Sequence, residues 1–322
     1  MFIKKGKSFY LGDLLCGLKQ LDPNGGWFKH SPVTGWDIDT PPVGQCDKIY
    51  LQDDLTFKDN KVLELEKYID HYQQDISKIT FYTWHKGLNK LYPALKIKWY
   101  PFFLQQHLDD AVKHKDELEQ AFNFTNKTNK FLCLNRNIRQ HRDIIYKKLK
   151  DNPLCVISYK QRGINSPLEN DWSLLDYRDW HTTNKVYLTN TKNLLVASEL
   201  YNKCCFSLVT ETRTNLPFDF VTEKSTQCFI ALHPALYVSN KNHVEFLRDW
   251  GFDLFDDIFD HSYDKVDDEK KRIDRLLLDN RKVLTAGLLI NDDIKKRLLA
   301  NRENYFTKYV DHLQSDVNKV GI

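Results

Sequence analysis

Short apolar runs alternate with amphipathic stretches along most of the chain, and this alternation predicts an α/β protein. In the first part of the chain, the runs that we expect to be strands are 47–51, 79–84 and 95–100. Periodic apolar positions at 62–72 and 108–122 predict helices between and after them. Strands that alternate with helices usually form parallel sheets, because a parallel pair needs a long crossover connection.

The pattern is repeated in the second part, after a polar, Asn- and Thr-rich segment at 121–130 that we interpret as a linker. The next elements are a strand, a helix and a strand, at 131–134, 140–149 and 154–159. Together they form a complete βαβ unit. We therefore predict two α/β domains, 1–125 and 126–322.

A long polar excursion with several Trp and Tyr residues, 161–193, interrupts the second domain. Regular structure is expected again as helices, at 194–200, 245–250, 267–280 and 292–306. Charged residues alternate with apolar ones in the last two of these helices, which is typical of amphipathic helices at a surface.

The most informative stretch lies inside this second domain, from residue 206 to residue 264. An apolar strand at 206–209 leads into a polar loop, and an amphipathic helix follows with its N-cap predicted at Thr222. A second apolar run at 230–238 predicts the next strand. Glu223 and Lys224 would then lie on the first helical turn, where free N–H groups and the positive end of the helix dipole favour anionic ligands.

A carboxylate beside an ammonium at such a position suits a nucleoside diphosphate. Glu223 can accept hydrogen bonds from ribose hydroxyls, and Lys224 can pair with a phosphate oxygen. The alternative is a solvated helix start, at which such a pair contributes only about 0.3–1 kcal/mol. The full order of strand, loop, helix and strand favours a ligand site.

Cations follow the first strand of the second domain, where no Gly-rich dinucleotide motif is present. The residues at this position are Asn135, Arg136, Arg139 and Arg142. Arg is suited to bidentate contact with phosphate. Further along the same helix we interpret the lysines as a solvated face: Lys147, Lys148 and Lys150. A nucleic-acid footprint is the alternative for the whole cluster.

Glu211 at the end of a strand, followed by a loop and by Val-Thr-Glu-Lys at the start of a helix, resembles the donor-binding half of the fucosyltransferase-like glycosyltransferases of GT-B architecture. The tail from Gly251-Phe252 to Ser262-Tyr263-Asp264 is similar to a variant found in phage and large-virus glycosyltransferases. The resemblance extends over about 131–275. It implies two Rossmann-like domains with parallel sheets facing a central cleft, the first on the acceptor side and the second binding a nucleotide sugar, with a last helix that crosses back.

The same resemblance implies a role for each matching residue. Glu223 would bind the ribose hydroxyls, Lys224 a diphosphate oxygen, and Glu211 would approach the donor sugar or the ribose. An Arg on the first helix of the second domain would hold the diphosphate, with Arg142 as the nearest match and Arg139 as the second. The loop at 214–218 departs from the fucosyltransferase pattern and leaves the sugar open.

Transfer with inversion also needs a base for the acceptor hydroxyl, expected from the first domain. The candidates at strand ends or first turns are Asp13, Asp53, Asp54 and His85, and none is distinguished by sequence. No metal site is expected, because the Asp37-Ile38-Asp39 spacing lies in a Pro/Gly loop without a preceding strand. No P-loop of the kind expected in a kinase is present.

Composition limits the remaining choices. The chain has 322 residues, with 47 basic and 44 acidic side chains, so its whole-chain charge of +3 does not indicate nucleic acid. Seven Cys without metal-ligand spacing indicate reduced, buried thiols. No apolar run long enough to span a membrane and no cleavable leader are evident in the sequence. Together these features favour a cytoplasmic protein, located in the host cytoplasm if the protein is viral.

Taken with these observations, the resemblance implies a metal-independent, inverting hexosyl- or pentosyltransferase with no cofactor beyond a UDP- or GDP-linked sugar as co-substrate. Its acceptor would be a hydroxyl, with a hydroxymethylated base in phage DNA and a surface glycan as the two candidates. A non-catalytic nucleic-acid-binding protein is the alternative from another class. No membrane partner is expected, and the oligomeric state is left open.

Overall fold

The computed structural model describes residues 8–11, 26–28, 30–31, 35–36, 48–51, 57–58, 61–62, 65, 80–83, 86–99, 102–135, 139–159, 190–216 and 220–313. The chain divides into two compact units. The first contains Met1–Gln106, Leu216–Phe220 and Leu313–Ile322, and the second contains His107–Asn215 and Val221–His312. The main boundary between the two units is thus at His107, whereas the sequence predicts a domain boundary at 125/126.

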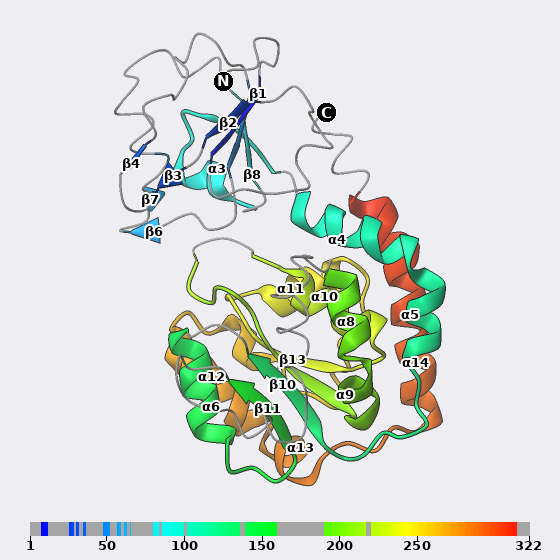
Figure 1. The fold of residues 1–322 in the computed structure, drawn as a ribbon. Coiled ribbons are helices and arrows are strands. Elements are labelled where there is room, and N and C mark those ends of the chain that lie inside the picture. Colours follow the sequence, from blue (N-terminus) through cyan, green and yellow to red (C-terminus); the bar gives the residue numbers. More distant parts are fainter. Residues whose placement is uncertain are drawn as a thin grey trace. The chain divides into compact units, whose positions relative to one another are not determined.

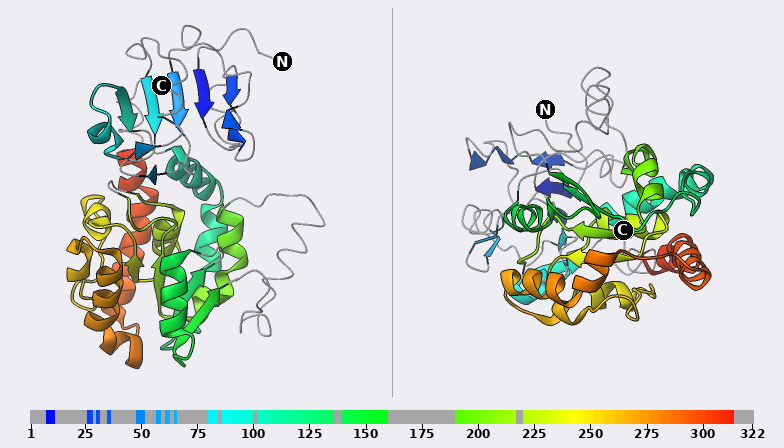
Figure 2. Two further views of the ribbon diagram at one scale, coloured as in Figure 1. Left: turned by 90° about the vertical axis from the view of Figure 1, so that its left-hand side faces the viewer. Right: turned by 90° about the horizontal axis from the view of Figure 1, so that it is seen from below.

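The first unit is organised around a five-stranded sheet in the order β2-β1-β5-β8-β9, and all its pairings are parallel. The strands are β1 (Ser8–Leu11), β2 (Gly26–Phe28), β5 (Lys48–Leu51), β8 (Thr80–Thr83) and β9 (Lys96–Trp99). Figure 2 shows them in its left panel as a row of arrows that point the same way. The strands predicted at 47–51, 79–84 and 95–100 are confirmed.

Smaller elements accompany this sheet. They are helix α3 (Leu88–Leu91) and two antiparallel pairs, β3 (His30–Ser31) with β4 (Gly35–Trp36) and β6 (Phe57–Lys58) with β7 (Lys61–Val62). Strand β2 lies in a part of the sequence that is rich in Gly, Pro and Trp, a composition typical of irregular structure. Most of the helix predicted at 62–72 lies outside the described residues.

The second unit contains a four-stranded parallel sheet in the order β11-β10-β12-β13. Its strands are β10 (Phe131–Asn135), β11 (Cys155–Tyr159), β12 (Phe206–Thr210) and β13 (Ala235–Val238). Every residue of β12 and β13 is buried. Such continuous apolar strands are expected where helices cover both faces of a sheet.

The helices of the second unit lie on both faces of this sheet (Figure 1). Helices α6 (Gln140–Leu149) and α12 (Glu269–Asp279) cover one face, and α8 (Asn190–Val196), α9 (Ser198–Lys203) and α10 (Glu223–Ile230) lie on the other. The remaining helical elements are α4 (Phe102–Lys113), α5 (Lys115–Ala121), α11 (His243–Asp249), η4 (Ser262–Lys265), α13 (Arg281–Ala286) and α14 (Asp292–Phe306). Right-handed crossovers that leave β10 and β12 in opposite directions place α6 and α10 on opposite faces.

The observed helices α6 and α14 match the ranges predicted for them, and three other predictions need correction. The single helix expected at 108–122 is two helices, broken at His114, and the one expected at 194–200 is also two, broken at Ala197. Only the second part of the apolar run 230–238 forms a strand. Ile230 ends α10, Leu232 has a φ of 56°, and β13 begins after Pro234. An apolar run alone does not separate the end of a buried helix from a buried strand.

The polar segment 121–130, predicted as a linker, packs onto the second unit. The Cys205 N–H donates to the Lys130 carbonyl over 2.7 Å, and the Thr128 N–H donates to the Lys203 carbonyl over 3.0 Å. Gly287 approaches the same segment so closely that a Cβ there would clash with the Asn129 carbonyl oxygen. The side chains of the segment add to these contacts, since the Thr128 hydroxyl donates to the Lys203 carbonyl over 2.7 Å. The segment is therefore part of the second unit.

None of the helices in the described part of the chain combines the length and the apolarity that a bilayer span requires.

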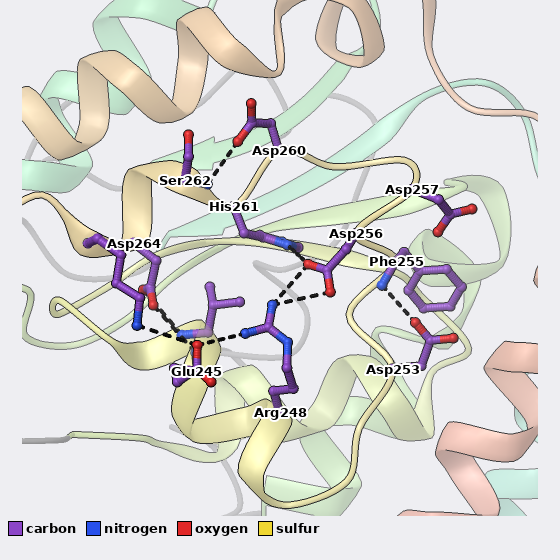
Figure 3. Close-up of polar contacts among 12 residues, drawn as sticks. Glu245, Arg248, Asp253, Phe255, Asp256, Asp257, Asp260, His261, Ser262 and Asp264 are labelled. Atoms are coloured by element: carbon purple, nitrogen blue, oxygen red, sulfur yellow. Dashed lines mark hydrogen bonds and ion pairs between the residues drawn. The ribbon is translucent and has the colours of Figure 1, made fainter.

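The loop between α11 and η4 is held by ion pairs and capping. Figure 3 shows Arg248 between Glu245 and Asp256, with His261 directed at the same Asp256 carboxylate. The Asp264 carboxylate accepts from the N–H groups of Val244 and Glu245 at the start of α11, over 3.2 and 3.4 Å.

From α14, Arg297 secures the other end of this loop. Its guanidinium donates to both carboxylate oxygens of Asp253 and of Asp257 over 2.6–2.9 Å, and it lies 4.4 Å from the centre of the Phe255 ring. Phe255 is buried at a φ of 61°, a backbone conformation that a non-glycine residue adopts only when its surroundings enforce it.

Replacing Arg297 by Met should therefore lower the free energy of unfolding by about 1–3 kcal/mol, because both bidentate pairs and the ring contact are lost together. Urea unfolding measures the change. Lys295→Met on the same helix is the matched control. Among the described residues Lys295 pairs with the exposed Asp292, over 2.9 Å, and its loss should change stability by less than about 0.5 kcal/mol. Equal effects of the two substitutions would show that the Arg297 network does not hold the loop.

Candidate functional site

In the sheet of the second unit the chain adds strands in one direction from β10 and in the opposite direction from β12. Most of the site residues that the sequence predicts and the structure describes lie at this point. From β10 the chain passes through α6 to β11 on one side, and from β12 it passes through α10 to β13 on the other. The carboxyl ends of β10 and β12 and the first turns of α6 and α10 therefore lie together at the C-terminal end of the two central strands. In open α/β sheets, ligands bind outside the strand ends at this kind of switch point.

Glu211 lies directly after β12 and is fully buried, and its carboxylate is saturated by donors of the chain itself. Oε1 accepts from the Thr222 N–H over 3.0 Å and from the Ser225 hydroxyl over 2.6 Å. Oε2 accepts from the Thr222 hydroxyl over 2.6 Å and from the Thr212 N–H over 3.2 Å. The carboxylate thus joins the end of β12 to the first turn of α10. This geometry makes Glu211 a positioning residue, in place of the direct sugar contact that the resemblance implies.

Thr222 is the N-cap of α10, as predicted: its side-chain oxygen accepts from the Lys224 N–H over 3.3 Å. The same hydroxyl donates to Glu211, so the cap is itself held in place. Because a capped helix begins at a defined residue, Glu223 and Lys224 have fixed positions on the first turn.

Glu223 has one polar side-chain atom that is buried without a hydrogen-bond partner. Only 9% of the residue is exposed, and one carboxylate oxygen, Oε1, accepts from the Lys224 ammonium over 2.7 Å. The other oxygen, Oε2, is buried without a hydrogen-bond partner. Burial raises the pKa of Glu223, but the charge and the hydrogen bond of Lys224, together with smaller contributions from His107 and the backbone, outweigh it, so that the net pKa lies below its usual range. The site therefore contains an ionised carboxylate oxygen that lacks a donor.

Beside Glu223 lies a group that sequence reasoning missed. His107 of α4 is buried, with Nδ1 3.1 Å from the Tyr305 hydroxyl of α14 and Nε2 3.4 Å from the amide nitrogen of Gln227 on α10. Burial lowers the pKa of His107 to about 4, although Glu223 and Asp110 oppose the shift, so the imidazole is neutral at pH 7. No local sequence pattern marks His107, because it meets Gln227 and Tyr305 only through the packing of helices that are distant in sequence.

The first turn of α6 is anchored to the same strand end by two buried side chains. Nη2 of Arg142 donates to the carbonyls of Thr210 and Glu211, each over 3.2 Å, and Nε2 of His141 donates to the Glu211 carbonyl over 2.8 Å. Arg142 is only 3% exposed. Its Nη2 serves the protein interior, which differs from the diphosphate contact that the resemblance implies for this residue.

Arg139 is placed differently from Arg142. It is the N-cap residue of α6, its side chain makes no capping hydrogen bond, and it is partly exposed. Its Nε is buried without a partner, and no ion pair to a described residue engages its guanidinium. An uncapped helix start beside an unengaged Arg favours an anion, so Arg139 rather than Arg142 is the candidate phosphate contact of this helix. Arg136 lies outside the described residues.

Asn135, at the end of β10, is 3% exposed and serves the sheet. Its Oδ1 accepts from the Thr210 hydroxyl, and its N–H donates to the Ser158 hydroxyl over 3.0 Å. These contacts join β10 to both of its neighbours, so Asn135 is a structural residue in place of the ligand contact expected from its position.

A Ser–His pair near the site does not have the geometry of a nucleophile. His243 Nε2 lies 2.9 Å from the Ser225 hydroxyl, but Ser225 is fully buried and donates its proton to Glu211. A substrate carbonyl could not reach it. The pair connects α11 to the N-terminus of α10.

The candidate bases Asp13, Asp53, Asp54 and His85 lie outside the described residues, as do Asp37 and Asp39. Among the residues that are described, no three His, Cys, Asp or Glu side chains are grouped so that they could hold a metal ion.

The fold and the site define a mixed α/β protein with parallel sheets, compatible with Rossmann-like folds, that carries a polar switch-point site in its second unit. Comparison with protein-family models, with curated proteins and with solved structures finds no match to this chain.

Proposed function

We propose that this chain is a nucleotide-sugar-dependent glycosyltransferase of GT-B type that binds its donor at the first turn of α10. The observation that carries the proposal is Oε2 of Glu223, a buried, ionised acceptor without a donor, beside Lys224 at the switch point. Leaving such an atom unpaired costs on the order of 1–3 kcal/mol, and more for a charged group, which a ligand with hydroxyl donors would remove.

A nucleoside diphosphate has the groups that this arrangement lacks. The ribose diol supplies O–H donors for Glu223, and the diphosphate supplies negative charge for Lys224, which is 34% exposed, and for the N–H groups of the first turn. Arg139 at the start of α6 is the second cation in the proposal. The charge that develops on the leaving diphosphate would be stabilised by these cations rather than by a metal.

Transfer to a hydroxyl acceptor with inversion is the reaction we propose, and the sugar is left open. A hydroxymethylated base in DNA and a surface glycan are the two acceptor candidates. The GT-B arrangement, with the base supplied by the first domain, is part of the same proposal.

The charges on α6 do not favour the alternative of a non-catalytic nucleic-acid-binding protein. Each lysine of the face in question pairs with an acid: Lys147 with Asp143 over 2.6 Å, Lys148 with Asp274 over 3.0 Å, and Lys150 with Asp151 over 3.8 Å. A face whose cations are paired in this way offers little net charge to a phosphate backbone.

Nucleotide binding tests the proposal in a thermal-shift panel with UDP, GDP, ADP and CDP, each with and without Mg²⁺. One diphosphate at 100-fold its Kd should stabilise the wild type by about 2.7 kcal/mol without metal, and Glu223→Ala should lose this effect. The 2′,3′-dideoxy form of that nucleotide should stabilise the wild type much less, because it lacks the donors for Glu223.

Glu245→Ala is the matched control, since Glu245 also lies in the first turn of a helix but pairs with Arg248 on the surface. It should keep the full nucleotide effect. The proposal fails if no diphosphate stabilises the wild type, or if Glu223→Ala and the dideoxy nucleotide behave like their controls.

A further inference from the structure

Two residues of α10 are accessible to a ligand. Of its eight residues, Glu223, Ser225, Thr226, Cys228, Phe229 and Ile230 are buried. Lys224 and Gln227 are partly exposed. A ligand that contacts Lys224 and follows the helix therefore meets Gln227 next.

Gln227 has one half of its amide engaged and the other half open. Its Nε2 lies 3.4 Å from Nε2 of His107, which is buried. A neutral imidazole has one donor and one acceptor nitrogen. Because the amide N–H can only donate, Nε2 of His107 accepts it, and the Nδ1–H of His107 donates to the Tyr305 hydroxyl over 3.1 Å.

This chain of hydrogen bonds fixes the direction of the amide. With its nitrogen turned toward His107, the carbonyl oxygen of Gln227 points away from that imidazole, and among the described residues it has no hydrogen-bond partner. Gln227 follows Glu223 by one helical turn, which separates their Cβ atoms by about 5–6 Å. The helix thus presents two acceptors in a row, Oε2 of Glu223 and Oε1 of Gln227.

Glu223 and Lys224 lie next to each other on the first turn of α10, where the ribose diol and the phosphates would bind. Gln227 lies one turn further along on the same face as Glu223, where a base attached to that ribose would lie. We infer that Gln227 selects the base of the nucleotide, accepting an N–H of the base edge through its carbonyl oxygen, while His107 and Tyr305 hold its amide in the required direction. This inference rests on the proposed nucleotide site.

The test compares full-length wild type, Gln227→Met and Gln227→Glu, using titrations with UDP, CDP, GDP and ADP and with ribose 5-phosphate as a probe without a base. Met has a similar length but no hydrogen-bonding group, and Glu keeps an acceptor at the same place. In Gln227→Met the affinity for the preferred nucleotide should fall by about tenfold, the value of one lost hydrogen bond, with ribose 5-phosphate unaffected. Gln227→Glu should keep the rank order of the four bases.

The alternative outcomes separate this inference from the proposed function. If a nucleotide binds the wild type but both variants weaken all four nucleotides and ribose 5-phosphate equally, Gln227 supports the helix and does not read the base. If Gln227→Met keeps the base preference, the inference also fails while the nucleotide site stands. If no nucleotide or ribose 5-phosphate binds the wild type, the proposed function fails and the inference with it. Melting of the unliganded variants shows whether each one is folded.

Discussion

Replacing Glu211 by Ala should lower the free energy of unfolding of the second unit by about 3–5 kcal/mol, the largest loss that we expect from a single substitution in this chain. Four groups would lose their acceptor: the N–H and the hydroxyl of Thr222, the hydroxyl of Ser225 and the N–H of Thr212. The buried guanidinium of Arg142 would also lose the opposite charge that favours its ionised form. A loss of this size is a large part of the stability of a typical domain.

Urea unfolding followed by circular dichroism measures this change, and Glu199→Ala provides the control. Glu199 also lies on a helix, but its carboxylate is 65% exposed and pairs with Lys203, so its removal should change stability by less than about 0.5 kcal/mol. The loss of stability in Glu211→Gln should lie between the losses in Glu211→Ala and Glu199→Ala. A neutral amide keeps one acceptor oxygen, but its NH₂ group cannot accept from the donors that Oε2 or Oε1 served. A change below 1 kcal/mol in Glu211→Ala would contradict the positioning role.

The second large effect should be a loss of stability in mild acid, caused by buried histidines. Burial lowers the pKa of His107 and of His141 to about 4, and it lowers the pKa of His233 and of His261 in the same direction. Below pH 6.5 the unfolded chain takes up protons that the folded chain does not accept until about pH 4. The stability present above pH 6.5 is therefore lost progressively as the pH falls, by about 2 kcal/mol each for His107 and His141 at pH 5.

Urea titrations at pH 7, 6 and 5 measure this loss. His141→Gln should remove about 2 kcal/mol of it at pH 5, since a Gln amide can donate to the Glu211 carbonyl at every pH and takes up no proton. His312→Gln is the control, because His312 is exposed and hydrated in both states, and it should keep the full loss. Equal stability of the wild type at pH 7 and pH 5 would show that the buried histidines protonate without cost.

Carboxylates extend the same trend to lower pH. For Asp253 and Asp256, burial raises the pKa, but the hydrogen bonds and charges of Arg297, Arg248 and His261 lower it more. Their contribution to stability is present at neutral pH and is lost only below the pH at which unfolded Asp titrates, about pH 4. Acid unfolding should thus begin with the histidines and be completed by the carboxylates.

Local chemistry was sufficient to predict several elements from the sequence. Thr222 marks the start of α10 because its hydroxyl accepts from an N–H only two residues away, and α14 begins at Asp292 because the Asn291 side chain accepts from the Ile294 N–H over 2.9 Å. The parallel α/β class follows from apolar runs that alternate with periodic ones. Interactions within a few residues decide these features, so a local pattern contains them.

The sequence also determined which residue types lie at the carboxyl edge of the second sheet: Asn135, Arg142, Glu211, Glu223 and Lys224 each lie at a strand end or in a first helical turn. Only the tertiary structure decided which of them are available to a ligand. Asn135, Arg142 and Glu211 bond to groups on other elements, as in the contact between Arg142 and the Glu211 carbonyl, 69 positions apart. Glu223 keeps an unpaired oxygen, and its neighbour His107 is joined to Tyr305 across 198 positions. The sequence could not reveal this division, because a buried polar group is satisfied by whatever donor or acceptor the fold brings within hydrogen-bond distance, and that depends on how distant segments pack.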